Sequence, residues 1–169
     1  MKKIIPTVLT TILFNPFIAN AASITEEEVI KAQIGWGDGI VKIGAAKDPR
    51  EAAIKHLEEF YAFEGKVLFK PTLASVKQFR GTQKEALSYF IGQDLAEDNG
   101  FALAPYVKVD WDNEGIIIDG NTALAMGNYY FTKTNGDVVK VEYSFGYFKD
   151  KEGNLKINLH HSSLPYSPK

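Results

Sequence analysis

The stretch TALAMGNYYFTKTNGDVVKVEYSFGYFK, residues 122–149, decides the fold class of this chain. Strand-like segments lie on either side of Asn135-Gly136, and this dipeptide is the strongest short-range signal of a tight β-hairpin. We therefore predict two long antiparallel strands, one over residues 122–133 and one over residues 138–149.

Both faces of the first of these strands are apolar. One face carries Leu124, Met126, Asn128 and Tyr130, and the other carries Ala123, Ala125, Gly127, Tyr129 and Phe131. A sheet with two apolar faces must have both covered, and helices of the same chain can cover one of them. The remaining face predicts contact with a second copy of the chain, so the expected partner is the protein itself, as a homodimer or a higher oligomer.

The segments before the hairpin read as helices. Thr25, Asp48 and Thr82 are each followed three residues later by a glutamate, which is the pattern that caps the start of a helix. Shorter strands are predicted at 67–69, 106–111, 115–119 and 154–162. Helices followed by consecutive hairpins predict an α+β domain, in which N-terminal helices pack on one face of a strongly curved antiparallel sheet.

Composition narrows the class of protein. The chain has 169 residues, 45% of them apolar, a formal net charge of -2 and no cysteine. This length fits one domain with a sizeable core. A slightly acidic chain lacks the basic face that nucleic-acid binding needs, so no nucleic-acid partner is expected. Without cysteine there is no disulfide framework, thiolate zinc site or cysteine nucleophile.

The first 21 residues have the features of a secretory signal peptide. Two lysines precede a mostly apolar run over residues 4–18, and Ala19-Asn20-Ala21 fits a cleavage site. A membrane anchor is the alternative, but the run is shorter than the roughly 20 residues of a span and contains Pro6 and Pro16. We expect a single mature domain over residues 22–169, exported to the periplasm or secreted, with no membrane contact after cleavage.

A long helix containing Trp36, two further helices and then a bent antiparallel sheet resemble the nuclear transport factor 2-like superfamily, whose fold is cone-shaped. The closing stretch KEGNLKINLHHSSLP is similar to the last hairpin of the association domain of calcium/calmodulin-dependent protein kinase II. That hairpin typically has a turn glycine, an aromatic anchor and a strand ending in His-x-His-Arg-Ser. In this chain Gly153 matches the turn glycine and Leu155 stands at the anchor position. His161 stands at the second histidine and Ser163 at the serine. The segments that resemble a group of bacterial exported proteins of this type are VLFKPTLA, ALSYFIG, GFALAPYVKVDW, ALAMGNYYFT and VEYSFGYFKD.

The departures from this resemblance limit what it implies. The kinase association domain lines its pocket with arginines, whereas this chain has only Arg50 and Arg80, and Ser162 stands where the last-strand arginine would be. An anion-binding role is therefore not carried over. Proteins of the bacterial group are sometimes labelled phosphoribosyl-AMP cyclohydrolase, and we reject that label because the enzyme's zinc is held by cysteines.

The adjacent histidines on the last strand should point to opposite faces. His161 shares a face with Ile157 and Leu159, so a regular strand places His161 in the helix-covered interior and His160 outside. The third histidine, His56, lies on a helix. With this distribution we expect no metal site and no cofactor. An interior histidine is either a hydrogen-bonded core residue or a group that contacts ligand or moves a proton.

Four further residues are candidates for lining a pocket. They are Trp36, Tyr106, Asp110 and Tyr143, which together with His161 offer an aromatic wall, hydroxyl donors and an acid/base group. Pocket enzymes of the superfamily use an Asp or His as acid/base and Tyr donors to polarise a carbonyl. Asp110 alternates with Val109 and Trp111, however, and is also explained as a solvated carboxylate on the outer face.

Two classes of function remain. We expect an exported domain that binds an unknown small molecule in a hydrophobic pocket or assembles as an oligomer, with no reaction assigned. The alternative is a small acid/base pocket enzyme of the isomerase, dehydratase or hydrolase type. A buried carboxylate within hydrogen-bond reach of His161 or of a tyrosine would favour the enzyme.

Overall fold

The structure is a computed structural model that describes residues 23–168, so the expected signal peptide lies outside the described residues. The helices are α1 (Glu26–Ala45), α2 (Pro49–Phe60), α3 (Gln83–Ile91) and the short 3-10 helix η1 (Phe101–Leu103). The strands are β1 (Leu68–Lys70), β2 (Tyr106–Asp119), β3 (Thr122–Lys133), β4 (Val138–Lys149) and β5 (Leu155–Ser163). Within residues 23–168 no helix has the length and apolar character to cross a membrane.

The helices begin where the capping motifs predict. The Thr25 hydroxyl accepts the Glu28 backbone N–H, and the Glu28 carboxylate accepts the Thr25 backbone N–H. A second such capping box, formed by Thr82 and Glu85, opens α3. Asp48 caps α2. Each cap satisfies backbone donors that a helix start leaves without partners, which explains why the three starts were readable from sequence.

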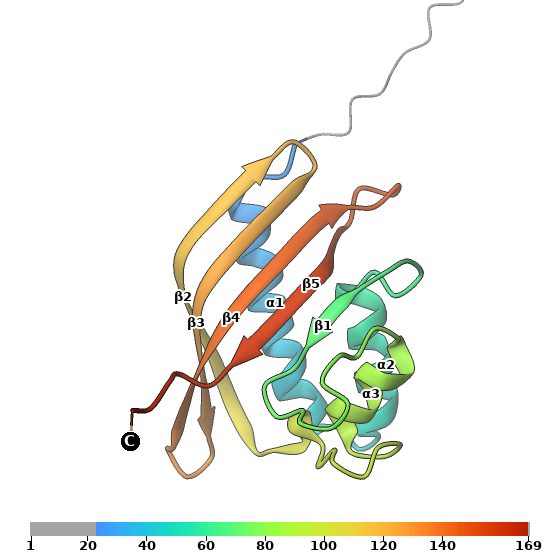
Figure 1. Cartoon of the computed structure of the whole chain (residues 1–169), viewed down its shortest axis with the longest axis vertical. Helices are drawn as coiled ribbons and strands as arrows, with labels where there is room; N and C mark the ends of the chain where they lie inside the picture. The colour runs from blue at the N-terminus through green and yellow to red at the C-terminus, as the bar shows by residue number, and fades with distance from the viewer. Residues whose placement is uncertain (1–22, 169) are drawn as a thin grey trace, which may run out of the picture.

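The five strands form one sheet in the order β1-β5-β4-β3-β2. The pairs from β2 to β5 are antiparallel, whereas β1 runs parallel to β5 at the edge. The prediction of an antiparallel sheet therefore holds for four strands and not for the fifth. Helix α1 crosses one face of the sheet, α2 and α3 pack near β1, and no described helix covers the opposite face (Figure 1). This is the α+β arrangement of the nuclear transport factor 2-like fold, as expected.

The core lies between α1 and the inner face of the sheet. Along β3 and β4 the buried residues are Ala123, Ala125, Tyr129, Phe131, Val141, Tyr143, Phe145 and Tyr147. The register of the hairpin sets Phe131 against Val139 and Ala125 against Phe145. On the outer face Leu124 and Met126 are more than half exposed. The apolar character of both faces is therefore real, and among residues 23–168 only one face is covered.

Strand β2 is longer than predicted. Residues 106–111 and 115–119 form one continuous strand, because an irregularity between Asn113 and Gly115 absorbs an extra residue instead of ending the pairing. Gly127 lies opposite this irregularity, and a Cβ there would come within 2.1 Å of the Asp112 carbonyl oxygen. The glycine thus allows the bent strand to approach β3 closely.

A bulge in β5 overturns the predicted orientation of the two histidines. Ile157 pairs with Tyr147 and Leu159 pairs with Gly146, so Asn158 is an extra residue in the strand. The alternation of faces shifts by one residue after the bulge, which buries His160 and exposes His161. The prediction that His161 faces the interior is therefore wrong, because it assumed a regular strand.

Candidate functional site

The bulge turns His160 and Ser162 toward a small cavity between the sheet and the helices. The cavity is lined by Trp36, Phe69, Pro71, Thr72, Tyr89, Phe90, Phe101, Tyr129, His160 and Ser162. Its volume is about 10 Å³, which is roughly the space that one water molecule needs. None of these ten residues is acidic or basic apart from the histidine. The cavity therefore combines apolar walls with hydroxyl groups and one imidazole.

Five residues, here called the histidine cluster, share a chain of hydrogen bonds: Trp36, Tyr61, Tyr129, His160 and Ser162. The Trp36 indole N–H donates to the Tyr61 hydroxyl at 3.0 Å, and that hydroxyl lies 2.7 Å from His160 Nδ1. On the other side of the ring, His160 Nε2 lies 2.8 Å from Ser162 Oγ, which lies 2.5 Å from the Tyr129 hydroxyl. All five residues are buried. Both imidazole nitrogens therefore have partners from the protein.

Aromatic rings enclose His160. Its ring centroid lies 4.1 Å from that of Phe145, 4.7 Å from that of Phe69 and 5.5 Å from that of Trp36. Removal from water disfavours the charged imidazolium, so burial holds the pKa of His160 well below its usual value. Burial also raises the pKa of Tyr129, and raises that of Tyr89 to about 12. At neutral pH these groups are uncharged hydrogen-bonding groups.

A buried ion pair holds the loop that carries Thr72. Arg80, at the end of this loop, makes two hydrogen bonds of 2.8 Å to the carboxylate of Asp98, which also accepts from the Ser88 hydroxyl. The backbone N–H groups of Val76, Ser75 and Lys77 donate to Glu97 and lower its pKa to about 2. These contacts join the loop to the segment after α3. In this position Thr72 lines the cavity together with Tyr89 and Tyr129.

The sequence candidates are scattered in the structure. Trp36 lines the cavity. Tyr143 is buried outside the cavity lining and hydrogen-bonds to Gln33 and Asn113 in a separate network. Tyr106 is half-buried at the start of β2, also away from the cavity lining.

The other two candidates lie on the outer face. Asp110 forms an exposed ion pair with Lys108, 2.8 Å between Nζ and Oδ1. This position matches the solvated carboxylate that was the alternative reading. His161 lines a depression of about 430 Å³ whose lining also includes Met126, Glu142 and the candidate Tyr143. Neither residue faces the histidine cluster.

Most of the residues that line the cavity or hydrogen-bond to the His160 imidazole were not predicted from the sequence. Tyr61 and Tyr129 were read as apolar face residues, and Thr72 and Tyr89 received no role. One signal was present: Gly146 sits inside a long strand, where glycine often marks a bulge. A Cβ at Gly146 would lie 2.9 Å from both Asn158 Oδ1 and Leu159 Cβ. That glycine points to the extra residue and thus to His160.

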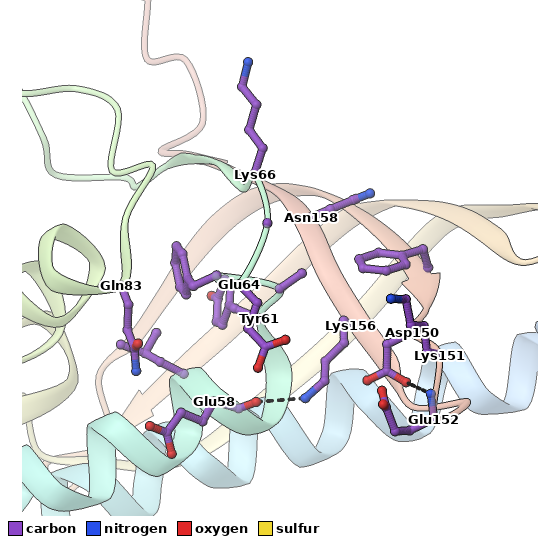
Figure 2. Close-up of a pocket in the computed structure, with 15 residues that line it drawn as sticks. Glu58, Tyr61, Glu64, Lys66, Gln83, Asp150, Lys151, Glu152, Lys156 and Asn158 are labelled. Carbon is purple, nitrogen blue, oxygen red and sulfur yellow. Dashed lines mark hydrogen bonds between the residues drawn. The ribbon is translucent and has the colours of Figure 1, made fainter.

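A larger groove lies between the end of α2 and the β4–β5 turn, with a volume of about 940 Å³ (Figure 2). Acidic and basic side chains alternate around it, among them Glu58, Glu64, Lys66 and Lys151. Its Lys156 ammonium is already bound to the backbone carbonyls of Glu58 and Glu59. Tyr61 is the buried titratable residue that lines this groove, and its hydroxyl is already bonded to Trp36 and His160. With mixed charge around it, the groove offers less chemistry than the small cavity.

The described part of the chain, residues 23–168, contains no cluster of three or more His, Cys, Asp or Glu side chains able to hold a metal ion. His56 lies in the apolar core, where neither ring nitrogen has a hydrogen-bond partner. Its ring packs against that of Phe60, with centroids 4.9 Å apart and the planes tilted by 45°. Desolvation lowers the pKa of His56 to about 3. The position fits a neutral core residue.

Comparisons with known proteins point to one activity. The family model for metal-independent carbonic anhydrase matches residues 27–164. A metal-independent carbonic anhydrase from Nostoc sp. is 43% identical over 167 residues, covering 93% of this chain and 80% of the relative.

Two solved structures support the fold. The iota-carbonic anhydrase from a cyanobacterium, solved in complex with bicarbonate, has a TM-score of 0.85 at 43% identity and covers 92% of this chain and 100% of its own. A Xanthomonas campestris protein assigned to the calcium/calmodulin-dependent protein kinase II association domains has a TM-score of 0.62 at 23% identity and covers 94% of this chain and 100% of its own. The second likeness concerns the fold alone.

Proposed function

The chain belongs to the metal-independent carbonic anhydrase family, and we propose that it catalyses the reversible hydration of carbon dioxide to bicarbonate in the cavity beside His160. The observation that carries the proposal is the chain of hydroxyl groups on His160, set in a cavity with otherwise apolar walls. The bicarbonate bound to the cyanobacterial relative is consistent with this reaction.

Family membership corrects the function expected from sequence. We had expected a binding or assembly domain to which no reaction could be assigned. That expectation rested on the absence of a carboxylate–histidine pair in the sequence. The family has a defined reaction, and the residues that line the cavity include no carboxylate, so the search for such a pair looked for the wrong chemistry.

The cavity lining fits both the uncharged substrate and the negative charge that develops on oxygen during the reaction. Carbon dioxide is neutral and apolar, and the aromatic walls formed by Phe69, Phe90 and Phe101 favour it over water. Because the cavity has room for about one water molecule, these walls must move apart when carbon dioxide and water bind. When the oxygen of a water molecule bonds to the carbon, one C=O electron pair moves onto oxygen and negative charge develops there. Preorganised hydroxyl donors in a dry site stabilise such charge strongly. Ser162 and Tyr129 supply these donors.

The attacking water also releases a proton. The cavity lining holds no acidic residue, and burial keeps His160 neutral. We therefore assign the acceptor of this proton to solvent or buffer. On this view the protein contributes orientation and stabilisation of the oxyanion, and the cavity is open enough for the proton to reach solvent.

Carbon dioxide hydration by the purified protein tests this function directly. We expect stopped-flow assays with a pH indicator to show catalysis by residues 22–169, retained after extensive treatment with a chelator and after elemental analysis finds no stoichiometric metal. A protein with no rate above the uncatalysed reaction would contradict the function. Activity that disappears with the chelator and returns with one added metal ion would contradict the metal-independent mechanism.

We also propose that two copies of the chain pair through the outer face of the sheet. Ile117, Leu124 and Met126 are 67%, 54% and 58% exposed and lie on neighbouring strands. Large apolar residues gathered on an uncovered face mark an interaction surface, and a two-fold axis allows one patch to cover itself.

Charge placed in this patch should separate the copies. We expect sedimentation equilibrium to give a dimer for the natural sequence and a monomer for Leu124→Glu. Val76→Glu is the matched control, because Val76 is also exposed but lies in the loop after β1. A natural chain that is monomeric at all micromolar concentrations would refute the pairing.

A further inference from the structure

The hydrogen bonds around Tyr61 fix more than the position of the imidazole. Trp36 Nε1 is only a donor, so the Tyr61 oxygen accepts its proton at 3.0 Å. The same oxygen lies 2.7 Å from His160 Nδ1. Among the described residues no third partner lies within hydrogen-bond reach of this buried phenol.

The two tautomers of His160 differ in what they do to this phenol. If Nδ1 carried the proton, both Trp36 and His160 would donate to Tyr61, and the phenolic proton would be buried without an acceptor. If Nε2 carries the proton, the phenol donates to Nδ1 and every group in this part of the cluster is satisfied. Each tautomer leaves one proton without an acceptor in the cluster, that of Tyr61 in the first case and that of Ser162 or Tyr129 in the second. Ser162 and Tyr129 line the cavity, where water or substrate can accept, whereas Tyr61 does not, so the second arrangement is the stable one.

The tautomer also decides how many protons face the cavity. Two contacts join the remaining groups: Nε2 to Ser162 Oγ at 2.8 Å, and Ser162 Oγ to the Tyr129 hydroxyl at 2.5 Å. With the proton on Nε2, the imidazole N–H and the hydroxyls of Ser162 and Tyr129 have three protons for these two hydrogen bonds. One hydroxyl proton is therefore left over. With the proton on Nδ1, the two hydroxyl protons are both consumed, and none is left for a ligand.

We propose that Tyr61, itself oriented by Trp36, is a positioning residue that holds His160 with its proton on Nε2, so that a hydroxyl of Ser162 or Tyr129 stays free to donate to an oxygen of the substrate. This inference rests on the proposed carbonic anhydrase function. It assigns His160 the role of a hydrogen-bond donor within the cluster, and it excludes the cavity-facing nitrogen as the base that takes the proton from water. Tyr61 does not touch the substrate, because it is absent from the cavity lining.

The protonated nitrogen can be observed directly by NMR. Long-range ¹H–¹⁵N spectra of ¹⁵N-histidine-labelled protein separate protonated from unprotonated ring nitrogens, and the chain has three histidines, which His56 and His161 variants assign. We expect His160 to show a protonated Nε2 and an unprotonated Nδ1 at pH 7. A protonated Nδ1 would overturn the proposal. This measurement needs neither activity nor a variant of Tyr61, so a failure of the proposed function would leave its result unchanged.

Removing the Tyr61 hydroxyl tests the consequence for catalysis. In Tyr61→Phe we expect the Nε2–H signature of His160 to be lost and kcat/KM for carbon dioxide hydration to fall about 10- to 100-fold, since loss of one preorganised donor to an oxyanion has effects of this order or larger. Tyr147→Phe is the matched control, because the Tyr147 hydroxyl is equally buried but has no partner. It should keep the signature and the activity. An unchanged His160 spectrum in Tyr61→Phe, with or without a loss of activity, would overturn the role assigned to Tyr61.

Discussion

Replacement of Ser162 by alanine is expected to lower kcat/KM for carbon dioxide hydration by about 100- to 1000-fold, the range found when one donor is removed from an oxyanion site. The Ser162 hydroxyl joins His160 Nε2 to the Tyr129 hydroxyl and lines the cavity. Its loss leaves the imidazole N–H without its acceptor and removes a donor to the substrate. Stopped-flow hydration assays measure the effect.

The next residue provides the control. Ser163 lies on the opposite face of β5, where its hydroxyl donates to Glu142 at 2.9 Å. Ser163→Ala should leave kcat/KM unchanged. Thermal unfolding of both variants separates loss of catalysis from loss of folded protein. Equal activity in the two variants would show that the inner face of β5 is not the catalytic face.

Acid should destabilise the protein steeply through its buried histidines. His56 has a folded-state pKa of about 3 against an ordinary value of 6.5. Between these values the unfolded chain binds a proton that the folded chain does not, so stability falls as the pH falls. The slope is about 1.4 kcal/mol per pH unit for one such group. The pKa of His160 is lowered in the same direction, so His160 adds to the loss.

Comparison of variants isolates the part that belongs to His56. We expect the free energy of unfolding, from urea titrations at pH 4 to 7, to fall less steeply in His56→Leu than in the natural chain, by about 1.4 kcal/mol per pH unit. The carboxylates contribute to both chains and cancel in the difference. His161→Gln is the control, because it removes a histidine from the exposed surface without altering the core. Parallel curves for the natural chain and His56→Leu would mean that His56 is charged or solvated in the folded state.

More of the fold than of the site could be predicted from the sequence. The reason is that helix starts and the hairpin depend on residues close together in the chain, whereas the site depends on residues far apart. Helix starts depend on side chains three residues apart, as at Thr25 and Glu28, and the long hairpin depends on the local Asn135-Gly136 turn. Such signals can be read in a short window. The parallel pairing of β1 with β5 joins segments about ninety residues apart, for example Phe69 and His160, and no local pattern encodes it.

The site depends on those distant contacts. Tyr61, Tyr129 and His160 come from three separate parts of the chain and meet only in the folded core. A single extra residue, Asn158, then decides which histidine joins them. Alternation along a strand predicts faces reliably until one irregularity occurs, and after it every assignment is reversed. Trp36 was found because its size and helical spacing mark a core position whatever the register of β5.

The strand after the bulge at Asn158 contains two histidines followed by two serines, over residues 160–163. Residues two apart on a strand share a face, so the first and third of the run form one histidine–serine pair and the second and fourth form another. In the observed register the first pair faces the cavity. A slip of one residue would present the second pair with the same two functional groups in the same order. The strand would therefore offer a histidine and a serine, two residues apart, to the cavity side in either register.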